Sequence, residues 1–269
     1  LEERGFDMLK EQGELSANFI FEDGKIYGVP TKFEGYFLLA NVDMFEAAGI
    51  ELPLDGWTYS QFREVCKTLT HGEGMDKVYG MYWSTRGEIF RPSMIAQTVL
   101  GNDYLYRNGG TETNLDNEAF VEFNQMVQDM MWVDGSTITH TDDVTQQLTP
   151  ETAFLSGRSA MSIGVWTIRS IKDLEKYPHD FETAYLPVPT SDTLEAKYSI
   201  SDMTVGDIMC ISPDTAYLDA ALEFLIWYTR GGMTEGTPYG RVPLNLSISG
   251  EEKLEAYMRN GRYPACRLC

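Results

Sequence analysis

The stretch that most constrains the fold is FLSGRSAMSIGVW, residues 154–166. Just before it, Thr149 and Pro150 predict the start of a short helix. Residues 159–163 then alternate in the manner of a strand with one buried face, and a turn follows that delivers Trp166. A large aromatic side chain therefore follows the carboxyl end of a strand, which is where open α/β sheets collect ligands.

Length and composition restrict the class of protein. The 269 residues are enough for two domains, and an apolar share of 43% with 12% aromatic residues predicts folded cores. A net charge of −20 argues against nucleic acid and anionic membrane surfaces as partners, because both would be repelled. No apolar run approaches the roughly 18 residues of a membrane span, and no signal peptide is visible at the N-terminus.

The four cysteines do not form a dense disulfide framework. Cys66 lies on the apolar stripe of a predicted helix and Cys210 in an apolar strand, so we expect both to be core thiols. Cys266 and Cys269 form a C-x-x-C that could be redox-active or bind half of a metal site. No second pair completes a zinc site, so no metal is predicted.

Periodicity and capping residues predict alternating strands and helices. Thr58 and Gln61 form a capping box, and apolar residues follow at helical spacing. Asn41 and Asp116 are predicted to cap two further helices, and Ser212 a helix with Pro213 at its first position. The predicted helices are 42–48, 58–70, 92–100, 117–132 and 251–258, and the predicted strands are 26–29, 36–40, 78–84, 159–163, 181–186 and 205–211.

Signatures of catalysis are missing from the sequence. It contains no nucleotide-binding loop, zinc-protease helix or nucleophile elbow, and its three histidines are far apart. The neighbouring Asp142 and Asp143 lack the ligand spacing of a calcium loop, and we expect them to be solvated and to act in capping. Acid–base chemistry by carboxylates stays open, because 41 acidic residues supply many chance pairs.

Several motifs follow one another in a recognisable order. They are GKIYGVP at 24–30, FLLANVDMFEAAGI at 37–50, WTYSQF at 57–62, FLSGRSAMSIGVW at 154–166 and SPDTAYLDAALEFLIWYT at 212–229. Together they resemble the extracellular (family 1) solute-binding proteins of carbohydrate ABC importers, the family that includes maltose-binding protein.

The resemblance implies an α/β fold of two lobes, of the periplasmic-binding-protein type II, that closes on its ligand like a hinge. Residues 1–36 would hold part of lobe I and the first crossing, 37–198 lobe II, and 199–269 the second crossing and the return to lobe I. Relative to the family, lobe I lacks its opening strands and helices and those beyond Arg262. We therefore expect an incomplete lobe I and a chain that is a fragment.

The implied function is binding of a mono- or oligosaccharide in the interlobe cleft and delivery to the transmembrane subunits of an ABC permease. No cofactor and no catalysis are implied. The protein would be a monomer, located outside the cell, anchored at its surface or in the periplasm.

The expected ligand-binding residues combine flat rings with charged groups at strand ends, the two kinds of group that sugars need. A glutamate at the position of Glu34 contacts sugar hydroxyls in maltose-binding protein, and the alternative for Glu34 is a solvated loop carboxylate. Trp83 has core packing as its alternative, and the charged residues after it have simple exposure. The full set is Glu34, Tyr36, Trp83, Glu88, Phe90, Arg91, Trp166, Asp202, Tyr239 and Arg241.

Two other functions remain open on the sequence alone. A carbohydrate-active hydrolase would use an acidic pair such as Glu34 and Glu88 across a glycosidic bond. A sensing subunit would bind the same ligands and signal to a membrane kinase. The ligand is also open, since members of related families bind polyamines, metal chelates or phosphate esters.

Overall fold

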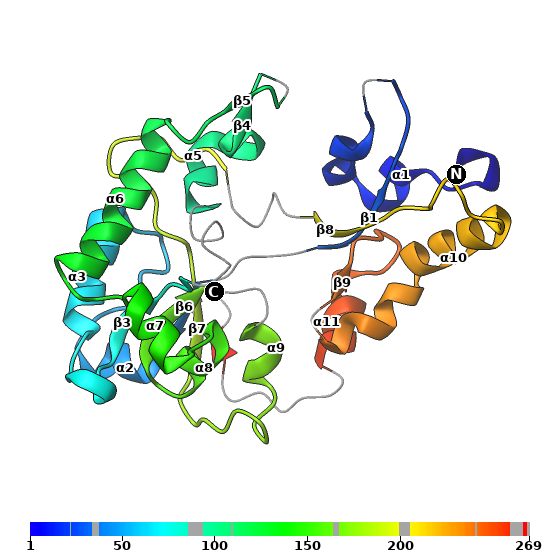
Figure 1. Ribbon diagram of the computed structural model, residues 1–269. Helices are drawn as coiled ribbons and strands as arrows, with labels where there is room; N and C mark the ends of the chain where they lie inside the picture. The colour runs from blue at the N-terminus through cyan, green and yellow to red at the C-terminus, as the bar shows by residue number, and fades with distance from the viewer. Residues whose placement is uncertain are drawn as a thin grey trace. The chain divides into compact units, whose positions relative to one another are not determined.

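The computed structural model describes residues 1–21, 23–33, 38–85, 94–108, 110–163, 167–198, 205–239, 241–258 and 266–267. Their contacts divide the chain into two compact units (Figure 1). Unit 1 comprises Leu1–Gly35 with Asp202–Gly261, and unit 2 comprises Tyr36–Ser201 with Arg262–Cys269. Among the described residues, no helix has both the length and the apolar character needed to cross a membrane.

Unit 2 is built on a five-stranded mixed sheet. Its strand order is β10 (Cys266–Arg267), β7 (Thr183–Leu186), β2 (Leu38–Asn41), β6 (Ser159–Ile163) and β3 (Tyr79–Tyr82). β2 runs antiparallel to both β6 and β7, whereas β3 runs parallel to β6 and β10 parallel to β7. β10 lies with unit 2, although the sequence analysis placed this end of the chain with lobe I.

Helices cover both faces of this sheet (Figure 1). Leu38 and Ala40 pack into one core cluster with α3 (Tyr59–Leu69) and α6 (Glu118–Trp132). Leu39, between them, packs into another cluster with Phe154 and Leu155 of α8 (Pro150–Leu155). All five residues of β6 are buried, so the prediction of one buried face for this strand was wrong. A strand that is buried on both faces is typical of a sheet covered by helices on both sides.

Local capping chemistry begins the helices of unit 2 largely as predicted. The capping box of Thr58 and Gln61 is confirmed, and so are the caps of Asn41 on α2 (Val42–Ala47) and of Thr149 on α8. Asn117 rather than Asp116 caps α6, because its side chain accepts a hydrogen bond from the backbone N–H of Ala119.

Unit 1 contains a three-stranded antiparallel sheet with β1 (Val29–Phe33) between β8 (Val205–Met209) and β9 (Val242–Pro243). Its core joins Phe6, Met8 and Val29 to Leu225 of α10 (Leu218–Arg230). α10 begins at Leu218, so the prediction that Ser212 and Pro213 start it was wrong. Cys66 is fully buried as predicted, but Cys210 is exposed.

The remaining helices and strands are shorter connecting elements. They are η1 (Glu2–Arg4), α1 (Met8–Gln12), η2 (Glu14–Phe19), η3 (Gly74–Asp76), η4 (Met94–Ala96), α5 (Gln97–Leu100), η5 (Gly101–Tyr104), β4 (Tyr106–Arg107), β5 (Glu112–Thr113), α7 (His140–Gln146), α9 (Thr167–Ile171), η7 (Gly232–Tyr239) and α11 (Gly250–Met258). The thiols of the C-x-x-C pair at Cys266 and Cys269 lie outside what the structure describes.

Close packing of β3 on α3 generates a stability prediction. A Cβ added at Gly80 would lie 2.1 Å from the carbonyl oxygen of Cys66. We expect Gly80→Ala to lower the free energy of unfolding by about 2 kcal/mol or more, because backbone rather than a movable side chain blocks the space. Gly250→Ala is the control, since nothing lies within 4 Å of its added Cβ. Denaturant unfolding followed by tryptophan fluorescence measures both, and equal stability of the two variants would contradict the packing.

Candidate functional site

One edge of the unit 2 sheet brings together the strand ends that precede or follow the expected ligand residues. Leu38, the first residue of β2, pairs with Ile163, the last of β6. On the other side of β6, Tyr82 at the end of β3 pairs with Ser162. The chain segments next to these strand ends carry Tyr36, Trp166 and the loop after Trp83. Seven of the expected residues lie outside the described ones, namely Glu34, Tyr36, Glu88, Phe90, Arg91, Trp166 and Asp202.

Trp83 itself belongs to the hydrophobic core. Its side chain is 2% exposed, and its ring meets those of Phe62 and Phe123 edge-on at centroid distances of 6.0 and 5.9 Å. No face of the indole is free to stack on a ligand in this arrangement. The structure therefore favours the core alternative for Trp83 over a role as a ligand platform.

Asp143 anchors the first residues of the loop that follows β3. It is fully buried and accepts hydrogen bonds from the Tyr82 hydroxyl at 2.8 Å and from the backbone N–H and hydroxyl of Thr85 at 3.0 and 2.6 Å. The sequence prediction of a solvated Asp143 was wrong, because its carboxylate is buried against Tyr82 of β3. Its neighbour Asp142 lies in the first turn of α7, which Thr139 caps, and its carboxylate accepts a 2.8 Å hydrogen bond from the Thr139 hydroxyl.

Unit 1 has a charged cluster at the end of its own sheet where β1 finishes. Phe33 at the end of β1 pairs with Val205 and with Val242, so the chain enters β8 and β9 beside the point where β1 ends. At the start of β9, the guanidinium of Arg241 donates a 2.6 Å hydrogen bond to Asp207. Lys32 places its Nζ 3.2 Å from the other carboxylate oxygen of Asp207.

This cluster holds Arg241 in place while leaving it reachable from solvent. Its side chain is 44% exposed, whereas that of Lys32 is 2% exposed. The backbone carbonyl of Asp207 also accepts a 2.7 Å hydrogen bond from the Thr31 hydroxyl, and Asp207 has a φ of +49°. An arginine oriented in this way can donate hydrogen bonds to hydroxyl or carboxylate oxygens. Tyr239 is the last residue of η7, and its ring lies outside what is described.

Lys32 and Asp143 are buried charged residues beside the candidate site residues, and sequence reasoning missed both. The first was missed because the predicted strand ended at Val29, whereas β1 continues through Lys32 to Phe33. No sequence pattern indicated that Asp143 is buried, because a pair of adjacent aspartates is usually exposed to solvent. In the described part of the chain, no group of three or more His, Cys, Asp or Glu side chains could hold a metal ion.

The two neighbouring aspartates generate a matched test of this anchoring. Asp143→Ala removes the acceptor for three donors, and we expect a loss of about 3 kcal/mol in the free energy of unfolding because buried donors are left unpaired. Asp142→Ala removes a partly exposed carboxylate that accepts a hydrogen bond from the capping hydroxyl of Thr139, and it should cost about 1 kcal/mol. Thermal or denaturant unfolding measures both. If the Asp142 variant is the less stable of the two, Asp143 does not anchor the loop.

Solved structures with the same fold include several solute-binding proteins. An ABC substrate-binding protein from Listeria monocytogenes in complex with cycloalternan is 18% identical with a TM-score of 0.71, covering 96% of this chain and 62% of that one. UgpB from Mycobacterium tuberculosis in complex with glycerophosphocholine is 18% identical with a TM-score of 0.70, covering 97% and 62%. The sugar-binding protein MalE from Xanthomonas citri is 16% identical with a TM-score of 0.64, covering 97% and 64%.

The chain thus spans less than two thirds of the length of these three solved relatives. Comparison with curated protein sequences gave no match. The family model for bacterial extracellular solute-binding proteins matches residues 5–259, nearly the whole chain. With the mixed α/β fold and its structural neighbours, this match shows that the chain belongs to the bacterial extracellular solute-binding protein family.

Proposed function

We propose that this protein binds a mono- or oligosaccharide and delivers it unaltered to the transmembrane subunits of an ABC permease. The observation that carries the proposal is the strand register at one edge of the unit 2 sheet, where Leu38 pairs with Ile163 and Tyr82 with Ser162. Because β2 and β6 are adjacent, the segment that precedes β2 and carries Tyr36 and the segment that follows β6 and carries Trp166 join the sheet side by side. Ligands of open α/β sheets collect at such edges.

The chemistry of the expected residues suits a carbohydrate. Trp166 and Tyr36 would offer ring faces to the C–H face of a sugar, and Glu34 would accept hydrogen bonds from its hydroxyl groups. In unit 1, Arg241, held by Asp207, could donate hydrogen bonds to a sugar hydroxyl. Trp83 is left out of this set because it lies in the core.

Solved structures with the same fold support a sugar as the solute, but they also include a protein in complex with a different kind of solute. Among the proteins described above, one is in complex with cycloalternan and one is named a sugar-binding protein, whereas UgpB is in complex with glycerophosphocholine. The solute of this chain is therefore proposed as a saccharide on the chemistry of Trp166 and its neighbours. Membership of an extracellular family supports a location outside the cytoplasmic membrane.

The test is a ligand-dependent shift of the melting temperature in a screen of mono- and oligosaccharides, with maltotriose as the first probe. Ligand at 100 times its Kd stabilises a folded protein by about 2.7 kcal/mol, so a binding sugar raises the melting temperature measurably. Trp166→Ala should abolish this shift. Trp132→Ala is the matched control, because Trp132 is 69% exposed on α6 and far along the chain from the proposed site.

Two results would contradict the proposal. A Trp166→Ala variant that melts at a lower temperature yet keeps the full sugar-induced shift would make Trp166 a packing residue. Release of reducing sugar from maltotriose by the wild-type chain, abolished by Glu34→Gln, would make the protein a hydrolase instead of a carrier.

A further inference from the structure

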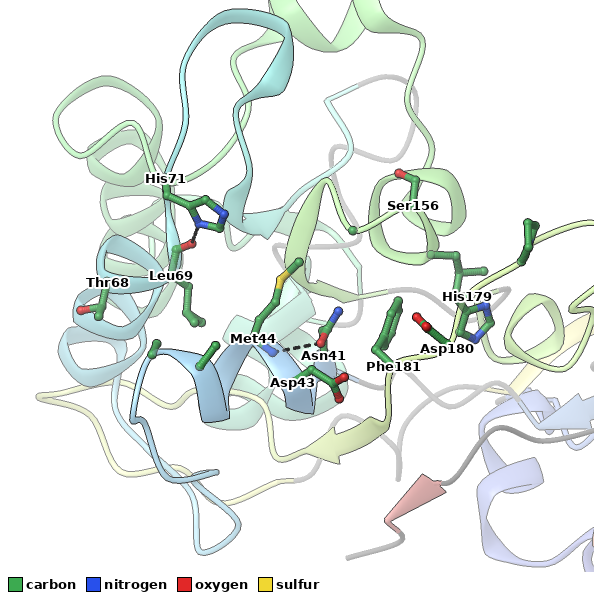
Figure 2. Close-up of a pocket in the computed structure, with 15 residues that line it drawn as sticks. Asn41, Asp43, Met44, Thr68, Leu69, His71, Ser156, His179, Asp180 and Phe181 are labelled. Atoms are coloured by element: carbon green, nitrogen blue, oxygen red, sulfur yellow. Dashed lines mark hydrogen bonds between the residues drawn. The ribbon is translucent and has the colours of Figure 1, made fainter.

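The opposite end of the unit 2 sheet carries a separate hollow. Its volume is about 690 Å³, within the usual range for small-molecule sites. It is lined by Asn41 at the end of β2, Gly157 just before β6 and Phe181 just before β7. The strand ends that adjoin the segments carrying Tyr36 and Trp166 are the other ends of β2 and β6, so the hollow lies about one strand length, roughly 15 Å, from them. Figure 2 shows it in close-up.

The charge around the hollow has one sign. Neither lysine nor arginine is among its lining residues, whereas Asp43 and Asp180 both line it and are both exposed. Asp43 lies next to the segment that carries Asp180, because it accepts a 3.1 Å hydrogen bond from the backbone N–H of Glu182, two residues after Asp180. The carboxyl end of α3 and the amino end of α2 both lie at the hollow, so the helix ends favour neither sign and the negative charge comes from the two aspartates. An anion would be repelled here.

One buried side chain on the wall of the hollow offers a hydrogen-bond donor to a ligand. The side chain of Asn41 is 3% exposed, and its Oδ1 accepts a 3.1 Å hydrogen bond from the backbone N–H of Met44. Its amide nitrogen is therefore a donor left over on the wall of the hollow, where Figure 2 shows it directed away from that bond. His179 uses Nδ1 at 2.7 Å from the carbonyl oxygen of Tyr177, and its Nε2 is buried without a hydrogen-bond partner among the residues that the structure describes.

The rest of the lining is apolar. Met44, Leu155 and Phe181 contribute side chains between these polar groups, and Figure 2 shows the Phe181 ring between Asn41 and Asp43 on one side and Asp180 and His179 on the other. Apolar walls with a few oriented polar groups are typical of sites for small amphipathic molecules.

We propose that this hollow binds a small organic cation that carries a hydroxyl group. Its ammonium group lies beside Asp43 and Asp180, its hydroxyl oxygen accepts a hydrogen bond from Asn41, and its alkyl part contacts Met44 and Phe181. The site is independent of the proposed sugar site and lies entirely within unit 2.

The experiment uses the full chain labelled with ¹³C at its methionine methyl groups and three probes of equal length. These are 5-aminopentan-1-ol, the neutral 1,5-pentanediol and the anionic 5-hydroxypentanoate. The Met44 methyl resonance is assigned among the 13 methionines by its loss in Met44→Leu. We expect a saturable shift of this resonance with the amine, at a Kd of about 1 mM or lower, and at least tenfold weaker responses to the other two probes.

Substitutions in the hollow then distinguish specific binding of the amine from non-specific binding. Asp43→Asn with Asp180→Asn should weaken amine binding about tenfold, since two charge-assisted contacts are removed. The double variant should fold, because asparagine at 43 keeps an oxygen for the Glu182 N–H. Asp55→Asn, an exposed residue of unit 2 outside the hollow, should bind like the wild type. The proposal is overturned if Met44 does not respond, if the diol shifts it equally, or if the double variant binds unchanged.

Discussion

The structure of unit 2 depends on the backbone pairing of β6. This strand is buried along its whole length and hydrogen-bonds to β2 on one side and β3 on the other. Buried backbone groups require partners, so the pairing fixes the register of three strands at once. The same pairing sets where the chain leaves the sheet at both ends, and both candidate sites follow from it.

At the end of the sheet where β6 finishes, hydrogen bonds of a buried carboxylate hold the segment that follows the neighbouring strand β3. Asp143 is buried beneath β3 and joins Tyr82 to Thr85, so the loop after β3 starts from a fixed point. A buried carboxylate with three donors is stable only while all of them are satisfied. In unit 1, Asp207 plays a comparable part for Arg241 through its ion pairs with that residue and with Lys32.

The sequence predicted what depends on neighbouring residues. The caps at Thr58, Asn41 and Thr149 were found because a cap and its helix lie within four residues of each other. Family membership was found from the order of motifs along the chain.

Residues whose environment is set by distant segments were not predictable in this way. Trp83 followed a strand and looked available to a ligand, but α3 and α6 bring Phe62 and Phe123 against its ring. Cys210 looked like a core residue from its apolar neighbours, yet it is exposed beyond the end of β8. The hollow at Asn41 arises from segments at 41–48, 68–71, 155–157 and 178–181, which no local pattern connects.

The central claim is that solute binds at the edge of the unit 2 sheet where β6 ends. Hydrogen–deuterium exchange of the wild-type chain, measured by mass spectrometry with and without a saturating oligosaccharide, tests it most directly. The account predicts that the oligosaccharide slows exchange in peptides that cover residues 83–93 and 163–168. It predicts no change in exchange at 41–48 or 155–157. Protection at the latter segments instead, or no protection at 163–168 under conditions where binding is measured independently, would contradict it.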